Sequence, residues 1–295
     1  MRLARVLGAV GRACIAAGVL ILLFVAYQLW GTGIREAQAQ DRLEDDFAAE
    51  LEEAEPPTTT TTVPGEVAPP STAAPLDVPA DGQPVAHLRI PAIGVDKIVV
   101  SGVTLQNLKD GPGHYPETPL PGQEGNAAIA GHRTTYGAPF NRIDELEAGD
   151  EITVETLQGS FRYLVREQLI VAPTQVEVLE DKGDNRLTLT ACHPKYSARE
   201  RIIVVAKLAP EHKPLPRPDR GEEEPLPTFE DIDGEGASAW PAIFWGVVCG
   251  AIWLLAWFLG RRWRRWPAYL IGFPLFMVAL FFFFEEFSRL LPNTI

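Results

Sequence analysis

Three long apolar stretches without a charged residue constrain this chain more than any other feature of its sequence. They cover residues 13–30, 240–259 and 267–284. A helix needs roughly 17–25 apolar residues to cross a bilayer, so each stretch is long enough. For the last two, the alternative is one buried hairpin in a soluble protein. The phenylalanine run at 281–284 and the arginines between the two stretches disfavour it. We therefore expect three transmembrane helices.

Basic residues flank these stretches on one side. They are Arg2, Arg5 and Arg12 at the first stretch and Arg261, Arg262, Arg264 and Arg265 between the last two. Since excess Lys and Arg marks the cytoplasmic side, both groups predict the same orientation. The N-terminus and the arginine turn lie inside, whereas residues 31–239 and the C-terminus lie outside. We expect a multi-pass protein of the cell membrane with an extracellular middle.

A second interpretation of the N-terminus makes residues 1–39 a cleaved signal peptide. Ala37-Gln38-Ala39 has the small-x-small form of such a cleavage site. The apolar run is long and its distance from Ala39 is wide, which favours an uncleaved anchor. In both cases the middle of the chain is exported and held by the C-terminal hairpin.

The acidic charge of the chain is confined to two short segments. The 295 residues carry a net charge of −13, to which residues 36–57 contribute −8 and residues 211–235 contribute −6. The rest is nearly neutral, so the chain lacks the basic surface of a nucleic-acid binder. Proline-rich sequence adjoins both segments and cannot bury a core. We interpret residues 36–84, acidic and then Pro/Thr-rich with threonines at 58–62, and residues 210–239 as extended tethers.

These boundaries leave residues 85–209 as one folded domain. Around it lie residues 1–35 as cytoplasmic N-terminus and first helix, 240–284 as a transmembrane hairpin and 285–295 as a short external tail. Alternating or β-branched runs bounded by turn residues predict strands at 87–90, 95–100, 127–130, 151–156, 160–171, 186–191 and 201–208, with short helices at 104–109 and 141–146. The domain is therefore mainly β. Many short strands with few helices favour a closed barrel over an open sheet.

One cysteine of the three stands apart. Cys14 and Cys249 lie in apolar stretches and are interpreted as small apolar residues, whereas Cys192 ends a predicted strand of the exported domain. A thiol without a partner in that compartment is either buried and inert or a nucleophile. His132 and Arg201 also lie at strand ends. A thiolate, an imidazolium that protonates a leaving amine and a fixed cation suit acyl transfer.

Other residues compete for these roles. Arg199 is two residues from Arg201 and is expected to share its strand face, but Arg201 directly precedes the apolar run 202–205, which favours Arg201. Arg133 is expected at the surface or at the substrate rim. His193 should point away from the thiol, because consecutive strand residues face opposite sides. His114, in a Gly/Pro loop, is expected to be structural or groove-lining.

Four segments, taken in order along the chain, resemble the motifs of one known family. They are His87-Leu88-Arg89-Ile90-Pro91, Gly111-Pro112-Gly113-His114-Tyr115 with Gly125-Asn126, Gly131-His132-Arg133, and Thr188-Leu189-Thr190-Ala191-Cys192 followed by Arg201. In these motifs residues 85–209 resemble the sortases, the cysteine transpeptidases of Gram-positive cell surfaces. The His-Arg-Thr-Thr-Tyr-Gly run beginning at His132 looks most like the actinobacterial class E group.

The resemblance implies an eight-stranded β-barrel with short helices. It implies that Cys192 is the nucleophile, that His132 is the general acid and then base, and that Arg201 holds the substrate and stabilises the oxyanion. The implied reaction cleaves an LPXTG-like sorting signal of an exported protein between Thr and Gly. The thioester then passes to an amine of a cell-wall precursor or surface protein. No cofactor and no metal are implied.

Two positions carry a finer implication. Class E signals are often LAXTG, and Tyr136 is the candidate reader of the Ala. The family usually has Thr before the cysteine, where this chain has Ala191. A hydrogen bond lost there is worth about 0.5–1.5 kcal/mol, which is too little to make the protein inert.

Several functions remain open besides wall anchoring. A pilin-polymerising sortase often carries a lid segment over the thiol, and no obvious Asp-aromatic lid motif precedes residue 85, which favours wall anchoring. A peptidoglycan L,D-transpeptidase usually shows Ser-x-Gly-Cys, whereas Ala191-Cys192-His193 stands here. A different cysteine hydrolase and a catalytically degenerate surface module are further alternatives. The presence of Cys192, His132 and Arg201 together disfavours the degenerate module.

Overall fold

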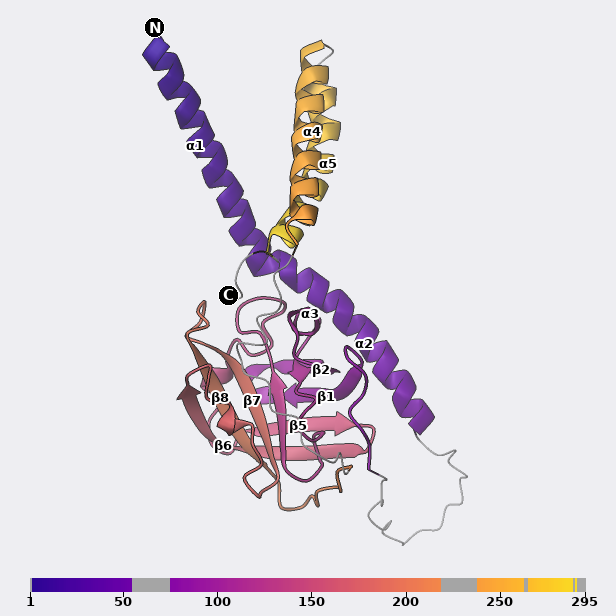
Figure 1. Ribbon diagram of the computed structural model, residues 1–295. Helices are drawn as coiled ribbons and strands as arrows, with labels where there is room; N and C mark the ends of the chain where they lie inside the picture. Colours follow the sequence, from indigo (N-terminus) through magenta and orange to yellow (C-terminus); the bar gives the residue numbers. More distant parts are fainter. Residues whose placement is uncertain (1, 55–74, 219–237, 263–264, 289, 291–295) are drawn as a thin grey trace. The chain divides into compact units, whose positions relative to one another are not determined.

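A computed structural model describes the chain except residues 1, 55–74, 219–237, 263–264, 289 and 291–295 (Figure 1). It divides into two compact units. One holds Met1–Gly31 and Gly234–Asn293, and the other holds Thr32–Asp233 with the last two residues. The threonine run at 58–62 lies outside the described residues.

The second unit is built on a closed β-barrel of eight strands. Their order around the barrel is β1-β2-β3-β4-β7-β8-β6-β5. The bounds are β1 Pro84–Ile90, β2 Val95–Ser101, β3 Gly113–His114, β4 Asn126–Ala130, β5 Glu151–Thr156, β6 Gly159–Val171, β7 Arg186–His193 and β8 Glu200–Leu208. The prediction of a mainly β barrel is confirmed. β3 was missed, because two residues carry no periodic pattern.

Short helical turns connect the strands. They are η2 Pro91–Ile93, α3 Leu105–Leu108, η3 Ile143–Glu145 and η4 Val176–Val178. The backbone N–H of Asn107 donates to Thr104 Oγ1 and begins α3 as an N-cap does. The short helices predicted at 104–109 and 141–146 correspond to α3 and η3.

The alternation of side chains gives each strand an inner and an outer face. The main core fills the barrel, and β7 contributes Leu187, Leu189 and Ala191 to it. A second cluster lies on the outer face of β4 and β8 and includes Ala130 and Ile203. Two of the strands that carry site residues, β4 and β8, are thus covered on both faces.

The acidic segment expected to begin a tether is instead a helix of the second unit. α2 spans Thr32–Ala54 and packs on the outer face of β2, where Leu43 and Phe47 meet Ile98 and Val100. Its buried residues, Thr32, Glu36, Ala39, Gln40, Leu43 and Phe47, recur at helical spacing. The tether interpretation of residues 36–54 is wrong. It rested on the many acidic residues and overlooked the few buried residues that recur at helical spacing among them. The small-x-small tripeptide ends at Ala39, which is buried inside α2.

The described ends of both proline-rich segments also pack on the barrel and form hydrogen bonds with it. Gln123 Nε2 donates to Leu76 O at 2.8 Å, and Leu76 packs against the core. Leu215 N donates to Gly122 O at 2.8 Å, and Glu124 N donates to Leu215 O at 2.9 Å. Residues 75–84 and 210–218 are therefore edges of the folded domain, and what was predicted of residues 219–237 lies outside the described residues.

The first unit contains α1 Arg2–Ala26, the π-turn η1 Tyr27–Gly31, α4 Trp240–Arg262 and α5 Arg265–Ser288. α4 and α5 form a hairpin in which Trp245 stacks on Phe282 with ring centroids 4.7 Å apart. Tyr27 packs edge-on to Phe281 of α5 at 5.2 Å. Three helical stretches are long and apolar enough to cross a membrane, as predicted.

Candidate active site

Cys192 and Arg201 face each other across β7 and β8. Antiparallel pairing places Cys192 opposite Arg201 and Ala191 opposite Ile202. Side chains directly opposite in such a pair have Cβ atoms roughly 4.5–5.5 Å apart. Ala191 and Ile202 belong to the inner core, so Cys192 and Arg201 lie on the outer face of the barrel wall.

His132 reaches the same face from β4. β4 and β7 are parallel, with Ala130 beside Thr190, and Gly131 N donates to Thr190 O at 3.0 Å. His132 and Cys192 each follow that pair by two residues. Since β4 adjoins β7 and β7 adjoins β8, three neighbouring strands bring the three predicted site residues to one end of one wall.

Polar residues around this wall are buried and ordered. Tyr115 is fully buried, and its hydroxyl lies 3.3 Å from Thr190 Oγ1. Burial, above all, raises the pKa of Tyr115, which also feels the charges of Arg201 and Cys192. Arg201 is 8% exposed, and its Nη1 donates to Ala198 O at 2.8 Å and to Glu200 O at 3.2 Å. These bonds fix the guanidinium beside the loop between β7 and β8.

The His132 ring packs beside Tyr136, and a positive charge lies nearby. Its Nε2 is buried and has no hydrogen-bond partner among the described residues. The Tyr136 ring lies 5.2 Å from it, and Lys109 Nζ lies 5.7 Å from the Tyr136 ring. Burial first, and the Lys109 charge second, lower the pKa of His132 to about 4. The resting imidazole is therefore neutral at pH 7.

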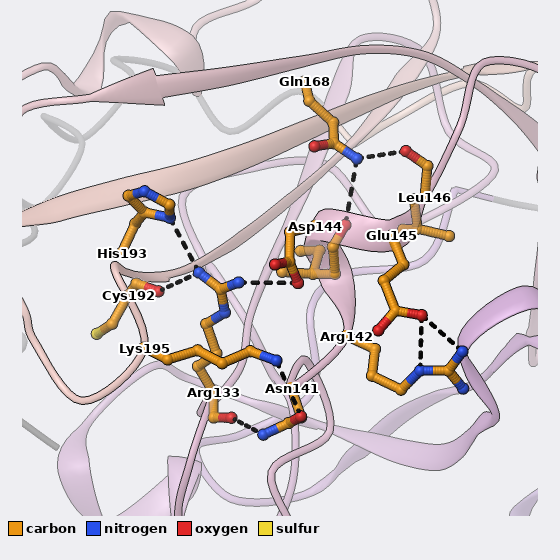
Figure 2. Close-up of polar contacts among 11 residues, drawn as sticks. Arg133, Asn141, Arg142, Asp144, Glu145, Leu146, Gln168, Cys192, His193 and Lys195 are labelled. Carbon is orange, nitrogen blue, oxygen red and sulfur yellow. Dashed lines mark hydrogen bonds and ion pairs between the residues drawn. The ribbon is translucent and has the colours of Figure 1, made fainter.

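Arg133 forms a buried clamp on the opposite side from His132. Its guanidinium donates to Cys192 O at 3.3 Å, lies 3.0 Å from His193 Nδ1 and pairs with Asp144 at 2.8 Å (Figure 2). The side chain of Arg133 is 2% exposed. The prediction of a surface or rim residue is wrong, because the Arg133 side chain turns inward to Asp144 and to the end of β7.

Figure 2 also shows how Cys192 and His193 diverge. The Cys192 carbonyl faces Arg133, whereas its sulfur points away, and the His193 ring lies on the other side of the strand from that sulfur. His193 thus points away from the thiol, as strand alternation predicts. His114 is fully buried, with Nε2 at 2.8 Å from Pro119 O, and has a structural role.

Comparisons with known proteins identify the family of this chain. Residues 88–209 match the family model of the sortase domain. Sortase SrtE1 of Streptomyces coelicolor is 35% identical over 223 residues, which are 69% of this chain but only 57% of that protein. Sortase SrtE2 of the same organism is 30% identical over 225 residues, which are 70% of this chain and 83% of that protein. The chain belongs to the sortases.

Sortases are cysteine transpeptidases, and the two Streptomyces relatives identify this one as class E, as its motifs predict. Among solved structures, sortase E of Streptomyces avermitilis is 36% identical and covers 46% of this chain and 93% of that chain, with a TM-score of 0.41. Sortase E1 of Streptomyces coelicolor, solved with a tripeptide in its active site, is 35% identical over 47% of this chain and 94% of that chain, with a TM-score of 0.42.

The departure at Ala191 has a structural explanation in this sortase. Ala191 is 4% exposed and packs in the inner core, on the face opposite Cys192. A hydroxyl at this position would therefore point away from the thiol. The hydroxyl on the thiol's face belongs to Thr190, whose partner is Tyr115.

Sequence reasoning missed four residues of this site. Tyr115, Thr190, Lys109 and Arg133 owe their positions to pairings between segments far apart in the chain. Arg133 carried one signal, since it adjoins His132, but Arg is rarely buried and was placed at the surface. In the part of the chain that the structure describes, no three His, Cys, Asp or Glu side chains gather as metal ligands would.

Proposed function

We propose that this sortase is anchored in the cell membrane and joins exported proteins to a cell-wall amine. Its substrate is an LPXTG- or LAXTG-like sorting signal, which it cleaves between Thr and Gly. One observation carries the proposal: Cys192 and Arg201 are cross-strand partners on the outer wall, and His132 follows the last paired residue of the neighbouring strand β4 by two positions, as Cys192 follows Thr190, the partner of that residue, on β7. A peptide lying against this wall meets a nucleophile, a proton carrier and a fixed cation together.

In the first half of the reaction, the Cys192 sulfur attacks the Thr carbonyl carbon of the signal. Arg201 stabilises the negative oxygen of the tetrahedral intermediate. The carbon–nitrogen bond then breaks, and the His132 imidazolium gives its proton to the departing Gly amine. A thioester between Cys192 and the exported protein remains.

In the second half, an amine of the wall precursor attacks the thioester carbon. His132 takes the proton of that amine, the carbon–sulfur bond breaks, and Cys192 leaves as a thiolate. The neutral resting imidazole suits the deprotonation that this half requires. For the first half, the proton must come to His132 from the Cys192 thiol.

The three apolar helices anchor the enzyme in this proposal. The arginines in the first half of α1 and around the turn from α4 to α5 orient the N-terminus and the hairpin turn toward the cytoplasm, which leaves the barrel outside. Wall anchoring is favoured over pilin polymerisation by the described residues 75–83, because they do not form a lid over the thiol. The side chains that hydrogen-bond to them are those of Gln123, Ser101 and Asn107, none of which is a proposed catalytic residue.

Tyr136 is the proposed reader of the second signal position. Its backbone has a positive φ of 49°, and its ring packs beside His132. An aromatic ring held there restricts the space for a residue upstream of the scissile Thr. A preference for the smaller Ala of LAXTG over Pro follows from that restriction.

Peptide cleavage by the full-length chain in detergent tests the function. LPXTG and LAXTG peptides are incubated with the enzyme and an amine, and mass spectrometry follows the cleaved peptide, the amide and a thioester on Cys192. We expect all three products, and none with Cys192→Ala. Cleavage that survives this substitution would contradict the mechanism, and a lack of any thioester in the wild type would contradict the function.

A further inference from the structure

The buried face of α2 contacts the loop that follows His132. Tyr136 N donates to Thr32 Oγ1 at 3.1 Å. One turn further along α2, the Glu36 carboxylate is 3% exposed and pairs with Lys97 at 2.6 Å. A Cβ added to Gly137 would lie 2.3 Å from Glu36 Oε2. The backbone of the loop at Gly137 therefore lies directly against the Glu36 side chain of α2.

That loop has a costly backbone conformation. Three consecutive residues have positive φ: Tyr136 at 49°, Gly137 at 71° and Ala138 at 44°. For residues other than Gly, such conformations persist only where the surroundings enforce them. Because the Tyr136 ring packs on the His132 ring, whatever holds the loop also holds the environment of the imidazole.

The same helix holds a second segment beside His132. Gln40 Nε2 donates to Ile98 O and to Asp110 O, both at 2.9 Å, and Ile98 N donates to Gln40 Oε1 at 2.8 Å. Lys109 immediately precedes Asp110 and is the cation nearest the Tyr136 ring among the contacts of the described residues. α2 thus fixes the backbone from which Lys109 extends.

We propose that α2 is a positioning helix of the active site, which holds the Tyr136 loop and the Lys109 segment against His132 through Thr32 and Gln40. The inference rests on the proposed role of His132 as the proton carrier. Thr32 and Gln40 are positioning residues, since neither touches the reacting atoms. Loss of their bonds lets the loop relax, admits water to the ring and weakens the influence of Lys109.

The fold gathers several titratable and charged groups around His132 and the loop that follows it. They are Lys109 from the segment after α3, Tyr136 from its own loop, Cys192 from β7, Arg201 from β8 and Glu36 from α2. Only Lys109 and burial account for the lowered pKa of the imidazole. Both depend on segments that α2 holds, so the titration of His132 reports on the helix.

Four variants of the full-length chain in detergent test the inference. Thr32→Val removes the hydroxyl and keeps the shape, and Thr32→Ser restores the hydroxyl. Gln40→Ala removes the second contact, and Glu44→Gln is the control on the exposed face of the same helix. Each variant is measured for kcat and KM with the sorting peptide, for the imidazole NMR titration of His132 and for thermal unfolding.

We expect Thr32→Val and Gln40→Ala to lower kcat about fivefold, as the loss of one ordered hydrogen bond does, with KM within about twofold. The titration midpoint of His132 should rise from about 4 toward the ordinary 6.5. Thr32→Ser and Glu44→Gln should match the wild type. A merely structural helix would change the thermal midpoint without moving the titration.

An unchanged kcat and titration in a folded Thr32→Val protein would overturn the proposal. So would an equal loss in Thr32→Ser, because the hydroxyl would then be irrelevant. If Gln40→Ala does not fold, kcat and the His132 titration of Thr32→Val alone decide whether α2 positions the active site. If the wild type cleaves no peptide, the proposed function fails, and the His132 titration, which needs no substrate, still decides the role of α2.

Discussion

The two sides of one short wall do different work in this sortase. On the outer side, His132 and Cys192 present the groups that we propose to react. On the other side, the next residues in the chain, Arg133 and His193, present groups that bind each other and Asp144. Neighbouring residues of an extended chain point to opposite sides. Each residue that we propose to react is therefore followed directly in the sequence by a residue that supports the wall from the other side. Changes on the outer side should affect the rate, and changes on the other side should affect rate and stability together.

The largest effect should come from His132→Gln on the outer side. Loss of the proton carrier should lower kcat about 10²–10⁴-fold, the range of general acid–base catalysis. The thermal midpoint should stay near that of the wild type, because His132 Nε2 makes no hydrogen bond within the described structure. Peptide turnover and circular dichroism check both. A large fall in the midpoint would show that this side is structural as well.

Arg201→Met tests the fixed cation, with Arg199→Met as the matched control. Loss of an oxyanion donor costs about 10²–10³ in kcat. Arg199 is exposed and precedes the strand, so its loss should change kcat less than about twofold, as surface changes do. Equal losses in the two variants would remove Arg201 from the proposed mechanism.

Arg133→Met should change stability and rate together. It removes the bonds to Cys192 O and Asp144, so we expect a loss of about 1–3 kcal/mol in unfolding free energy. The end of β7 loosens at the same time, and kcat should fall about tenfold, as a small misplacement of reacting groups does. Arg133→Lys, which keeps the charge, should recover part of the stability. A normal midpoint with a reduced rate would contradict the clamp.

The pH dependence of stability tests Asp144 separately. Burial raises its pKa, but the Arg133 hydrogen bond and charge outweigh burial and hold the pKa below its ordinary value. A depressed carboxyl pKa stabilises the fold above the unfolded value of about 3.9 and loses that effect as the pH falls through the folded value.

Asp144→Asn should therefore unfold at a lower temperature than the wild type at pH 6, and the difference should shrink below about pH 4. Asp144 is partly exposed, so solvent screening limits the charge effect to roughly 1 kcal/mol. A difference that stays constant from pH 6 to pH 3 would show that the pair does not contribute as proposed.

The smallest effect should come from Ala191→Thr. The side chain at 191 points into the core, away from the thiol. A Thr hydroxyl there should therefore change kcat less than about threefold, which is less than the loss or gain of one direct hydrogen bond can cause. A tenfold gain in thioester formation would mean that a hydroxyl at 191 reaches the thiol, which would contradict the assignment of faces.

Much of the barrel was predictable because strands β1, β2 and β4–β8 carry alternating or β-branched runs. The proposed site residues Cys192, His132 and Arg201 could be picked out because each lies at or close to an end of such a run and matches a family motif. α2 was not, because nine acidic residues between positions 36 and 57 concealed its sparse buried stripe. Arg133, Tyr115 and Lys109 were not, because their surroundings arise only when distant segments meet.

The contact between Gln40 and β2 has a consequence for the solubility of the domain. β3 covers only the end of β2, at Val100 and Ser101, so the backbone of Ile98 lies beyond that short partner. Gln40 satisfies both polar groups of Ile98, while Leu43 and Phe47 cover its side chain and that of Val100. An open strand edge invites pairing with a second molecule. A barrel shortened to begin after α2 would expose that edge and an apolar strip, and should aggregate where the longer chain stays dispersed.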